Sequence, residues 1–183
     1  MHLMRHALPD AAHRARLGPA AAGVLVVGVG NAYRHDDAVG LVAARRLGAA
    51  ARGAVTLRES SGEGAALMEV WVGAGAVILI DAVSSGAPAG TIHRVDAVSR
   101  VVPPGWGRYS SHAFAVAEAI ELARVLNRLP RRLIVFGVEG RRFDAGVGLS
   151  PEVADAVETL VRRGLAEIAR LGRGRASRSS RGS

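Results

Sequence analysis

Four side chains of this sequence have the chemistry of a metal or hydrolytic site: three carboxylates and one imidazole. Asp36 and Asp37 are adjacent and follow an apolar run that ends in the glycine-containing segment Gly28–Asn31. Asp81 ends another apolar run, and His112 follows two serines. Carboxylates and an imidazole together suit a first-row divalent cation, which relieves the repulsion between neighbouring acids. Asp37, Asp81 and His112 are therefore our candidate ligands.

The chain between residues 23 and 171 alternates between segments of strand and helix character. Continuous apolar runs that end in glycine or an acid are typical of parallel strands buried on both faces. We expect five strands, at 24–30, 55–59, 76–80, 91–95 and 132–138, of which the alternating 91–95 segment is a candidate for an antiparallel strand. Helices are expected at 37–51, 64–72, 111–126 and 151–171, with Asp36 as N-cap of the first. This order predicts an α/β fold, a single-domain three-layer sandwich with a mostly parallel twisted sheet and helices on both faces.

The candidate ligands fall where such a fold places its sites. In open α/β sheets, ligands bind beyond the carboxyl ends of the strands. Asp37 and Asp81 follow apolar strands, and His112 lies at the start of a helix whose connection returns to the same edge. Each residue taken alone also fits a structural role, as a helix cap, a turn residue or a helix-terminal residue. Their joint placement on one edge favours a site.

The net charge of +8 first suggests a nucleic-acid partner, but its distribution does not. All 24 basic residues are Arg. Residues 1–22 carry a net charge of +2 and residues 172–183 carry +4, which leaves +2 for the whole body between them. We therefore expect no nucleic-acid partner, a loose N-terminal extension at 1–22 and a disordered basic tail at 172–183.

Two absences from the sequence narrow the class of protein. No apolar run approaches the roughly 20 residues that a membrane-spanning helix needs. There is no Cys, which excludes a thiolate metal site or a cysteine nucleophile and fits a reducing compartment. We expect a cytoplasmic monomer without a membrane partner.

A nucleotide-binding module is the first alternative function. Gly28 and Gly30 begin like a dinucleotide-binding loop, and Glu59 ends the second strand where a ribose-binding acid would stand. The third glycine of that pattern is replaced by Tyr33, and two acids occupy the helix start where a pyrophosphate would bind. The residues therefore disfavour a nucleotide, although they leave this function open.

Short segments along the chain, taken in sequence order, resemble the motifs of the hydrogenase maturation proteases. The resemblance begins with Gly28–Asn31 and Asp36–Gly40 and closes at Gly148–Pro151. Between them lie five further matching segments: Ser61-Gly62-Glu63, Ile80-Asp81-Ala82-Val83, Gly90-Thr91-Ile92, Ser110-Ser111-His112 and Val138-Glu139-Gly140. The resemblance covers about residues 24–168.

The resemblance implies an endopeptidase that removes the C-terminal extension of a nickel–iron hydrogenase large-subunit precursor after nickel insertion. Asp37, Asp81 and His112 match the family's metal-binding trio, and we expect them to be both the nickel ligands and the catalytic residues. Nickel is expected to arrive with the substrate. His35 and Ala38 stand where glycine is frequent in the family, which puts the loop conformation in question. A noncatalytic metal-site chaperone for the same subunit is the second alternative function.

Overall fold

The computed structural model describes residues 23–103, 106 and 113–179, which form one five-stranded sheet with helices on both faces. The strands are β1 (Val24–Val29), β2 (Val55–Ser60), β3 (Ala76–Val83), β4 (Ile92–Asp96) and β5 (Arg132–Glu139). Their spatial order is β2-β1-β3-β5-β4. All neighbours are parallel except β4, which runs antiparallel to β5. The predicted fold class is confirmed.

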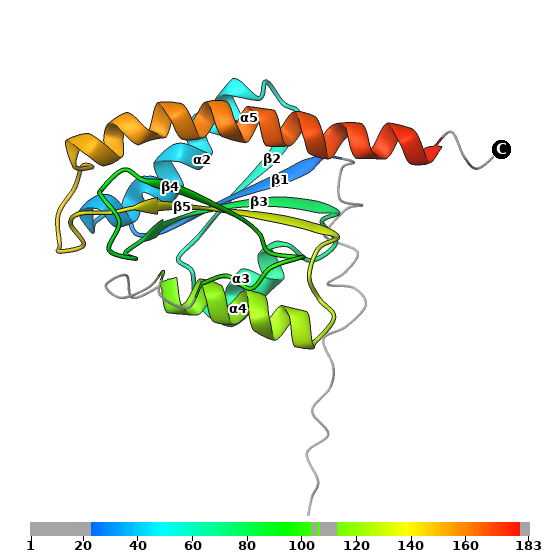
Figure 1. Cartoon of the computed structure of the whole chain (residues 1–183), viewed down its shortest axis with the longest axis horizontal. Helices are drawn as coiled ribbons and strands as arrows, with labels where there is room; N and C mark the ends of the chain where they lie inside the picture. The colour runs from blue at the N-terminus through cyan, green and yellow to red at the C-terminus, as the bar shows by residue number, and fades with distance from the viewer. Residues whose placement is uncertain (1–22, 104–105, 107–112, 180–183) are drawn as a thin grey trace, which may run out of the picture.

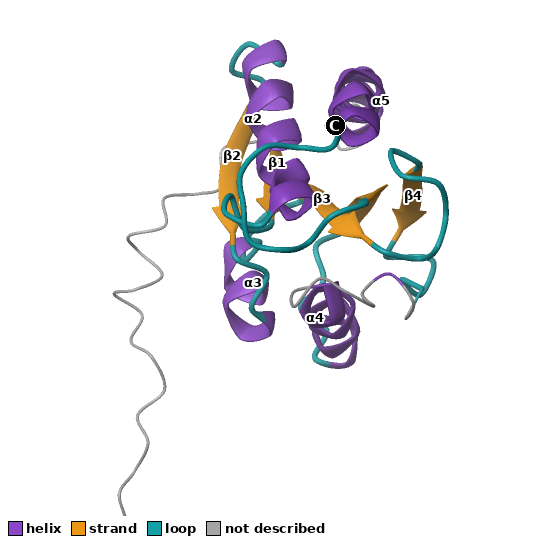
Figure 2. Ribbon diagram, turned by 90° about the vertical axis from the view of Figure 1, so that its left-hand side faces the viewer, coloured by secondary structure: helices purple, strands orange, loops and turns teal. Residues whose placement is uncertain are grey.

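The helices cover both faces of this sheet. They are the short 3-10 helix η1 (His35–Ala38) and the α-helices α2 (Val39–Ala50), α3 (Gly64–Val70), α4 (Ala113–Val125) and α5 (Pro151–Ser179). Helices α2 and α5 lie on one face, and α3 and α4 lie on the other (Figures 1 and 2). The predicted three-layer sandwich is therefore observed.

The continuous apolar runs of the strands follow from this layering. Along β3, Ile78 and Ile80 pack into the core beneath α2 and α5, whereas Val77 and Leu79 pack into the core beneath α3 and α4. All four side chains are fully buried. A strand covered on both faces needs apolar residues at every position, which is why strict alternation is absent from the sequence.

Two elements near the candidate acids differ from the prediction. Strand β3 continues to Val83 because Ala82 and Val83 are buried and keep pairing with β5, so Asp81 lies inside the strand. The segment predicted as the start of the first α-helix is the 3-10 turn η1. The expectation that Asp36 caps this helix is wrong, because Asp36 lies inside η1 and its carboxylate accepts hydrogen bonds from residues 141, 142 and 150 instead.

The last helix is longer than predicted. Helix α5 ends at Ser179, eight residues beyond the predicted end at Leu171, so much of the segment expected to be disordered is helical. The apolar periodicity stops near Leu171, but Arg and Ala are good helix formers and each Gly costs only about 1 kcal/mol. The predicted loose extension at 1–22 lies outside the described residues.

Helix α2 touches the sheet backbone at Gly40. A Cβ at this position would overlap the carbonyl oxygens of Val29 in β1 and Ile80 in β3. We expect Gly40→Ala to lower the free energy of unfolding by about 3 kcal/mol, because the helix must move away from the sheet. Urea denaturation measures this change. Gly48→Ala in the same helix is the matched control, since its Cβ would lie an ordinary 3.7 Å from Leu57.

The control should stabilise the protein by up to about 1 kcal/mol, because alanine is the better helix former. Equal effects of the two substitutions would contradict the close approach of α2 to the sheet.

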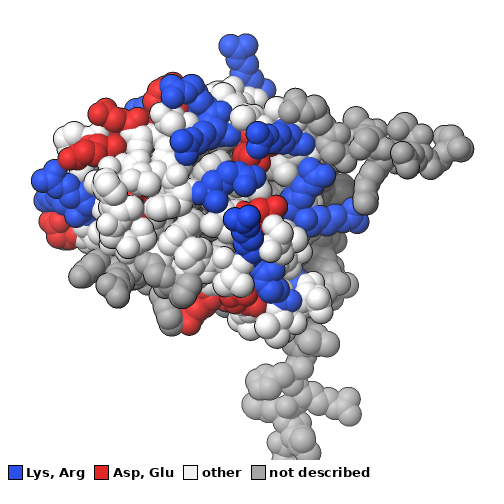
Figure 3. All heavy atoms as spheres, viewed as in Figure 1, with Lys and Arg blue, Asp and Glu red and all other residues white. Residues whose placement is uncertain are grey.

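The outer surface mixes the two signs of charge. In Figure 3, acidic side chains lie among the arginines on the face toward the viewer. This arrangement fits the near-balanced charge of the body. Within the described part of the chain, no helix combines the length and apolar character needed to cross a membrane.

Candidate active site

The candidate site lies at the carboxyl ends of three adjacent strands, β1, β3 and β5. Residues 30–38 follow β1, and residues 140–150 follow β5. The two loops meet, since the backbone N–H of His35 donates to the carbonyl of Gly146 at 3.0 Å and that of Gly146 donates to the carbonyl of Tyr33 at 2.8 Å. This is the edge at which ligands bind in open α/β folds.

Two of the three predicted ligands are buried side by side at this edge. Asp37 in η1 and Asp81 in β3 are 1% and 2% exposed. An Asp81 carboxylate oxygen, Oδ1, accepts a hydrogen bond from the backbone N–H of Ala82 at 2.8 Å. Burial, and then repulsion from the Asp37 carboxylate, raise the pKa of Asp81 to about 8. The site therefore resists a second negative charge unless a cation accompanies it.

The third predicted ligand, His112, lies outside the described residues. The described part of the chain holds no group of three or more His, Asp or Glu side chains that could bind a metal ion. The prediction that His112 joins Asp37 and Asp81 thus stays a prediction.

Asp36 holds the loop after β5. Its Oδ2 accepts hydrogen bonds from the backbone N–H groups of Arg141 and Arg142, each at 2.9 Å, and from the Ser150 hydroxyl at 2.8 Å. Its Oδ1 accepts from the backbone N–H of Ser150 at 2.6 Å. Burial alone would raise the pKa of Asp36, but these hydrogen bonds lower it below its ordinary value. Asp36 therefore fixes the loop beside Asp37 instead of capping a helix.

We expect Asp36→Asn to lower the free energy of unfolding at pH 7 by about 3 kcal/mol, because an amide cannot accept all four hydrogen bonds. Because the folded pKa of Asp36 is lowered, its stabilisation is present above the unfolded value of 3.8 and disappears as pH falls through the folded value. Urea denaturation at pH 7 and pH 3 measures both effects. The control is Asp155→Asn, at an exposed position of α5. Equal losses of unfolding free energy at pH 7 for the two variants would contradict the role of Asp36 in holding the loop.

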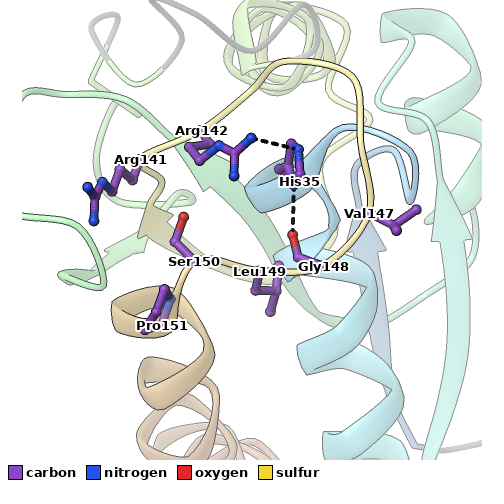
Figure 4. A pocket seen from close by; sticks show the side chains of 8 residues that line it. All are labelled: His35, Arg141, Arg142, Val147, Gly148, Leu149, Ser150 and Pro151. Carbon is purple, nitrogen blue, oxygen red and sulfur yellow. Dashed lines mark hydrogen bonds between the residues drawn. The ribbon is translucent and has the colours of Figure 1, made fainter.

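His35 packs against the same loop. Its backbone φ is +44°, and its Nδ1 lies 3.3 Å from the carbonyl oxygen of Gly148. Its Nε2 lies 3.0 Å from the Arg142 guanidinium, and a dashed line marks this contact in Figure 4. A Cβ at Gly146 would overlap the His35 ring, so Gly146 makes room for this imidazole. The loop thus accommodates the His35 imidazole together with the positive backbone φ of that residue.

The start of η1 is unsuited to a pyrophosphate. A dinucleotide fold offers backbone N–H groups and a positive helix end to the phosphates. Here Asp36 and Asp37 are buried at that position, and the Asp37 backbone carbonyl lies against Gly30, where an added Cβ would overlap it. Two carboxylates favour a cation over an anion at this end of the sheet.

Comparison with known proteins decides the family. The family model for hydrogenase maturation proteases matches residues 45–167, about two thirds of the chain. The chain belongs to the hydrogenase maturation protease family. The family is one of proteases, so this maturation protease is an enzyme, a peptidase.

Individual relatives agree with this assignment. The hydrogenase expression/formation protein HupD of Thiocapsa roseopersicina is 29% identical over 154 residues, which cover 81% of this chain and 69% of HupD. HoxM of Azotobacter vinelandii is 28% identical over 162 residues, covering 81% and 77% of the two chains. The structure of the hydrogenase maturating endopeptidase HybD from E. coli is 24% identical, with a TM-score of 0.69, and the match covers 82% of this chain and 94% of HybD. That structural likeness supports the fold.

One buried cluster of the maturation protease escaped prediction. Glu139, at the end of β5, is 1% exposed and accepts hydrogen bonds from the backbone N–H groups of Ser85 and Gly86 at 2.6 and 2.8 Å. The His93 Nε2 on β4 lies 3.3 Å from it, and the His93 ring contacts Trp106. In the sequence, Glu139 stood out only as part of segment 138–140, one of the segments that resemble the family's motifs. Its partners lie about 50 residues away in the sequence, so nothing local indicated its role.

Proposed function

We propose that this maturation protease removes the C-terminal extension of a nickel–iron hydrogenase large-subunit precursor after nickel has been inserted. The observation that carries the proposal is the buried acid pair Asp37 and Asp81 at the strand ends. Burial and repulsion make this pair unfavourable as two free anions. A divalent cation brought by the substrate would relieve that repulsion. Family membership supplies the reaction class.

The nickel belongs to the substrate in this proposal. The chain has no Cys, so thiolate ligands of the nickel would come from the precursor. Asp37, Asp81 and His112 would complete the coordination and hold the peptide in place, which lowers the barrier by positioning the scissile bond. The metal would polarise the carbonyl or activate a water, which adds across the amide bond to give a new carboxylate and a new amine.

The loop from 140 to 150 would then form one wall of the substrate site. Asp36 anchors this loop by four hydrogen bonds, immediately beside Asp37. A fixed wall keeps the peptide from drifting away from the metal, and misplacement by about 1 Å costs on the order of 100-fold in rate. Asp36 is therefore a positioning residue in the proposal.

The proposal is tested with purified protein and two forms of one large-subunit precursor, one loaded with nickel and the other free of it. Mass spectrometry follows the loss of the C-terminal peptide. Cleavage of the loaded form alone is the expected result. Equal cleavage of both forms would remove nickel recognition from the proposal. Stable binding of the loaded form without any cleavage would favour the chaperone alternative.

A further inference from the structure

Arg34 is a partly buried cation that has no carboxylate partner among the described residues. Its Nη2 donates to the carbonyl oxygen of Phe143 at 2.8 Å, and its buried Nε has no hydrogen-bond acceptor among the described residues. The other partly buried arginine of the described chain, Arg124, is paired with Glu121 at 3.1 Å. A buried donor left unsatisfied costs about 1–3 kcal/mol, so this arrangement calls for a ligand.

Arg34 lines a cavity of about 490 Å³ at the carboxyl ends of the strands. The cavity walls come from the segments that follow β1, β3 and β5: Arg34, Ser84, Gly140, Arg141, Phe143 and Asp144. Arg34 precedes Asp37 by three residues, and Ser84 follows Asp81 by three residues. The backbone N–H of Asp37 donates to the Arg34 carbonyl at 3.1 Å, so one turn joins the cavity to the acid pair.

The other charged groups of this cavity are already paired. Arg141 forms an ion pair with Glu152 at 3.0 Å, and in Figure 4 its side chain points away from His35. Asp144 pairs with Arg142 at 3.2 Å and lies 3.6 Å from the His35 ring. Neither ion pair includes Arg34. The unbalanced charge in the cavity is therefore the Arg34 guanidinium.

We propose that Arg34 binds a carboxylate of the precursor polypeptide, in the stretch next to the bond that is cut. A planar guanidinium binds a carboxylate through two parallel hydrogen bonds and fixes its orientation as well as its position. The identity of the polypeptide rests on the proposed function, whereas carboxylate binding by Arg34 stands on the cavity alone. The carboxylate comes either from an acidic side chain of that stretch or from the chain end that the cut creates.

Nuclear magnetic resonance of the whole chain tests the binding directly. The side-chain Nε–H signal of Arg34, identified by its loss in Arg34→Lys, is followed during titration with N-acetylglycinate. We expect this signal to shift with N-acetylglycinate, or with the α-amide of N-acetylaspartate, and not with uncharged N-acetylglycinamide. The first probe stands for a chain end and the second for an acidic side chain, so the stronger binder identifies the source. No shift of this signal with either carboxylate would overturn the proposal.

Variants measure how much of the binding depends on the guanidinium. Arg34→Lys keeps the positive charge but loses the two parallel N–H donors of the guanidinium, so we expect it to bind the tighter-binding carboxylate probe about tenfold more weakly than the wild type does. Arg34→Gln also loses the charge, and we expect it to bind this probe about 100-fold more weakly. Arg46→Gln is the control, because Arg46 is an exposed arginine of α2. Melting temperatures show whether each variant is folded. Undiminished binding by a folded Arg34→Gln would overturn the proposal.

Cleavage of the nickel-loaded precursor then links the cavity to the reaction. Arg34→Lys should raise KM by about tenfold with a smaller change in kcat, since the guanidinium positions the substrate through its carboxylate. Where the carboxylate belongs to a side chain, its removal from the precursor by Asp→Asn or Glu→Gln should have the same effect on the wild type and no further effect on the variant. Additive effects of the two changes would contradict the pairing. Carboxylate binding without any precursor cleavage would refute the proposed function and leave the Arg34 site standing.

Discussion

The free protein is expected to lose stability as pH rises from about 4 to 9, because Asp81 must give up its proton inside β3. Burial, and then repulsion from Asp37, raise the pKa of Asp81 from 3.8 to about 8. Between these two values the folded chain binds more protons than the unfolded chain. The contribution of Asp81 is thus fully present below the unfolded pKa and is lost as pH rises through the folded pKa. A shift of this size corresponds to about 6 kcal/mol.

Asp81→Asn isolates this contribution from the other titrating groups. The amide has nearly the same shape and cannot ionise, so the variant should gain several kcal/mol relative to the wild type between pH 5 and pH 9. Urea denaturation at both values measures the difference. Glu158→Gln, at an exposed position of α5, is the control and should show a constant difference. A constant difference for Asp81→Asn as well would contradict the buried, protonated state.

Asp37→Asn should reduce the pH dependence without removing it. Repulsion from Asp37 is the smaller of the two causes that raise the pKa of Asp81, and burial remains in the variant.

The second large effect is on processing. Asp37→Asn and Asp81→Asn should each lower kcat/KM for the nickel-loaded precursor by at least about 100-fold, because in the proposed function each removes a negatively charged oxygen ligand of the substrate's metal. For Asp81→Asn, the expected change in stability and the expected change in activity have opposite signs, since this variant should be more stable than the wild type at pH 8 and yet process the precursor far more slowly. Loss of activity therefore cannot be attributed to unfolding. The rate of release of the C-terminal peptide measures it.

Two control variants are compared with Asp37→Asn and Asp81→Asn. Glu158→Gln should process the precursor at the wild-type rate, since it lies on the exposed side of α5. Asp36→Asn should lower the rate less than either ligand variant does, because it acts through the loop it anchors. Processing of the precursor at the wild-type rate by Asp37→Asn or Asp81→Asn would contradict the proposed role of that residue in the site.

The sheet was predictable because burial on both faces leaves a local mark. The runs 24–30 and 132–138 are apolar at nearly every position, and both are strands of the structure. Strand 91–95 alternates, and the observed β4 is the antiparallel edge strand. The end of β3 was predicted wrongly because a charged residue was taken as a strand terminus. In the fold, Asp81 is buried by elements that lie far from it in the sequence.

Within the described part of the chain, the acids at the strand ends could be picked out from the sequence. The pair at 36–37 and the later Asp81 stand out by residue type and by their place after apolar runs. The different roles of the two adjacent acids could not be predicted from the sequence, because Asp36 is hydrogen-bonded to groups more than 100 residues away. Arg34 stayed unnoticed for a similar reason. Its unpaired state emerges only when the loops after β1 and β5 are brought together around one cavity.

The proposed coordination of the substrate's nickel by Asp37 and Asp81 can be tested directly. Nickel-loaded precursor is mixed with the protein and frozen before cleavage, and the X-ray absorption spectrum of the nickel is recorded with and without the protein. Wild-type protein should add oxygen or nitrogen ligands to the nickel, and Asp37→Asn and Asp81→Asn should each add fewer. A nickel spectrum that wild-type protein leaves unchanged, while the precursor is bound, would contradict the proposed site.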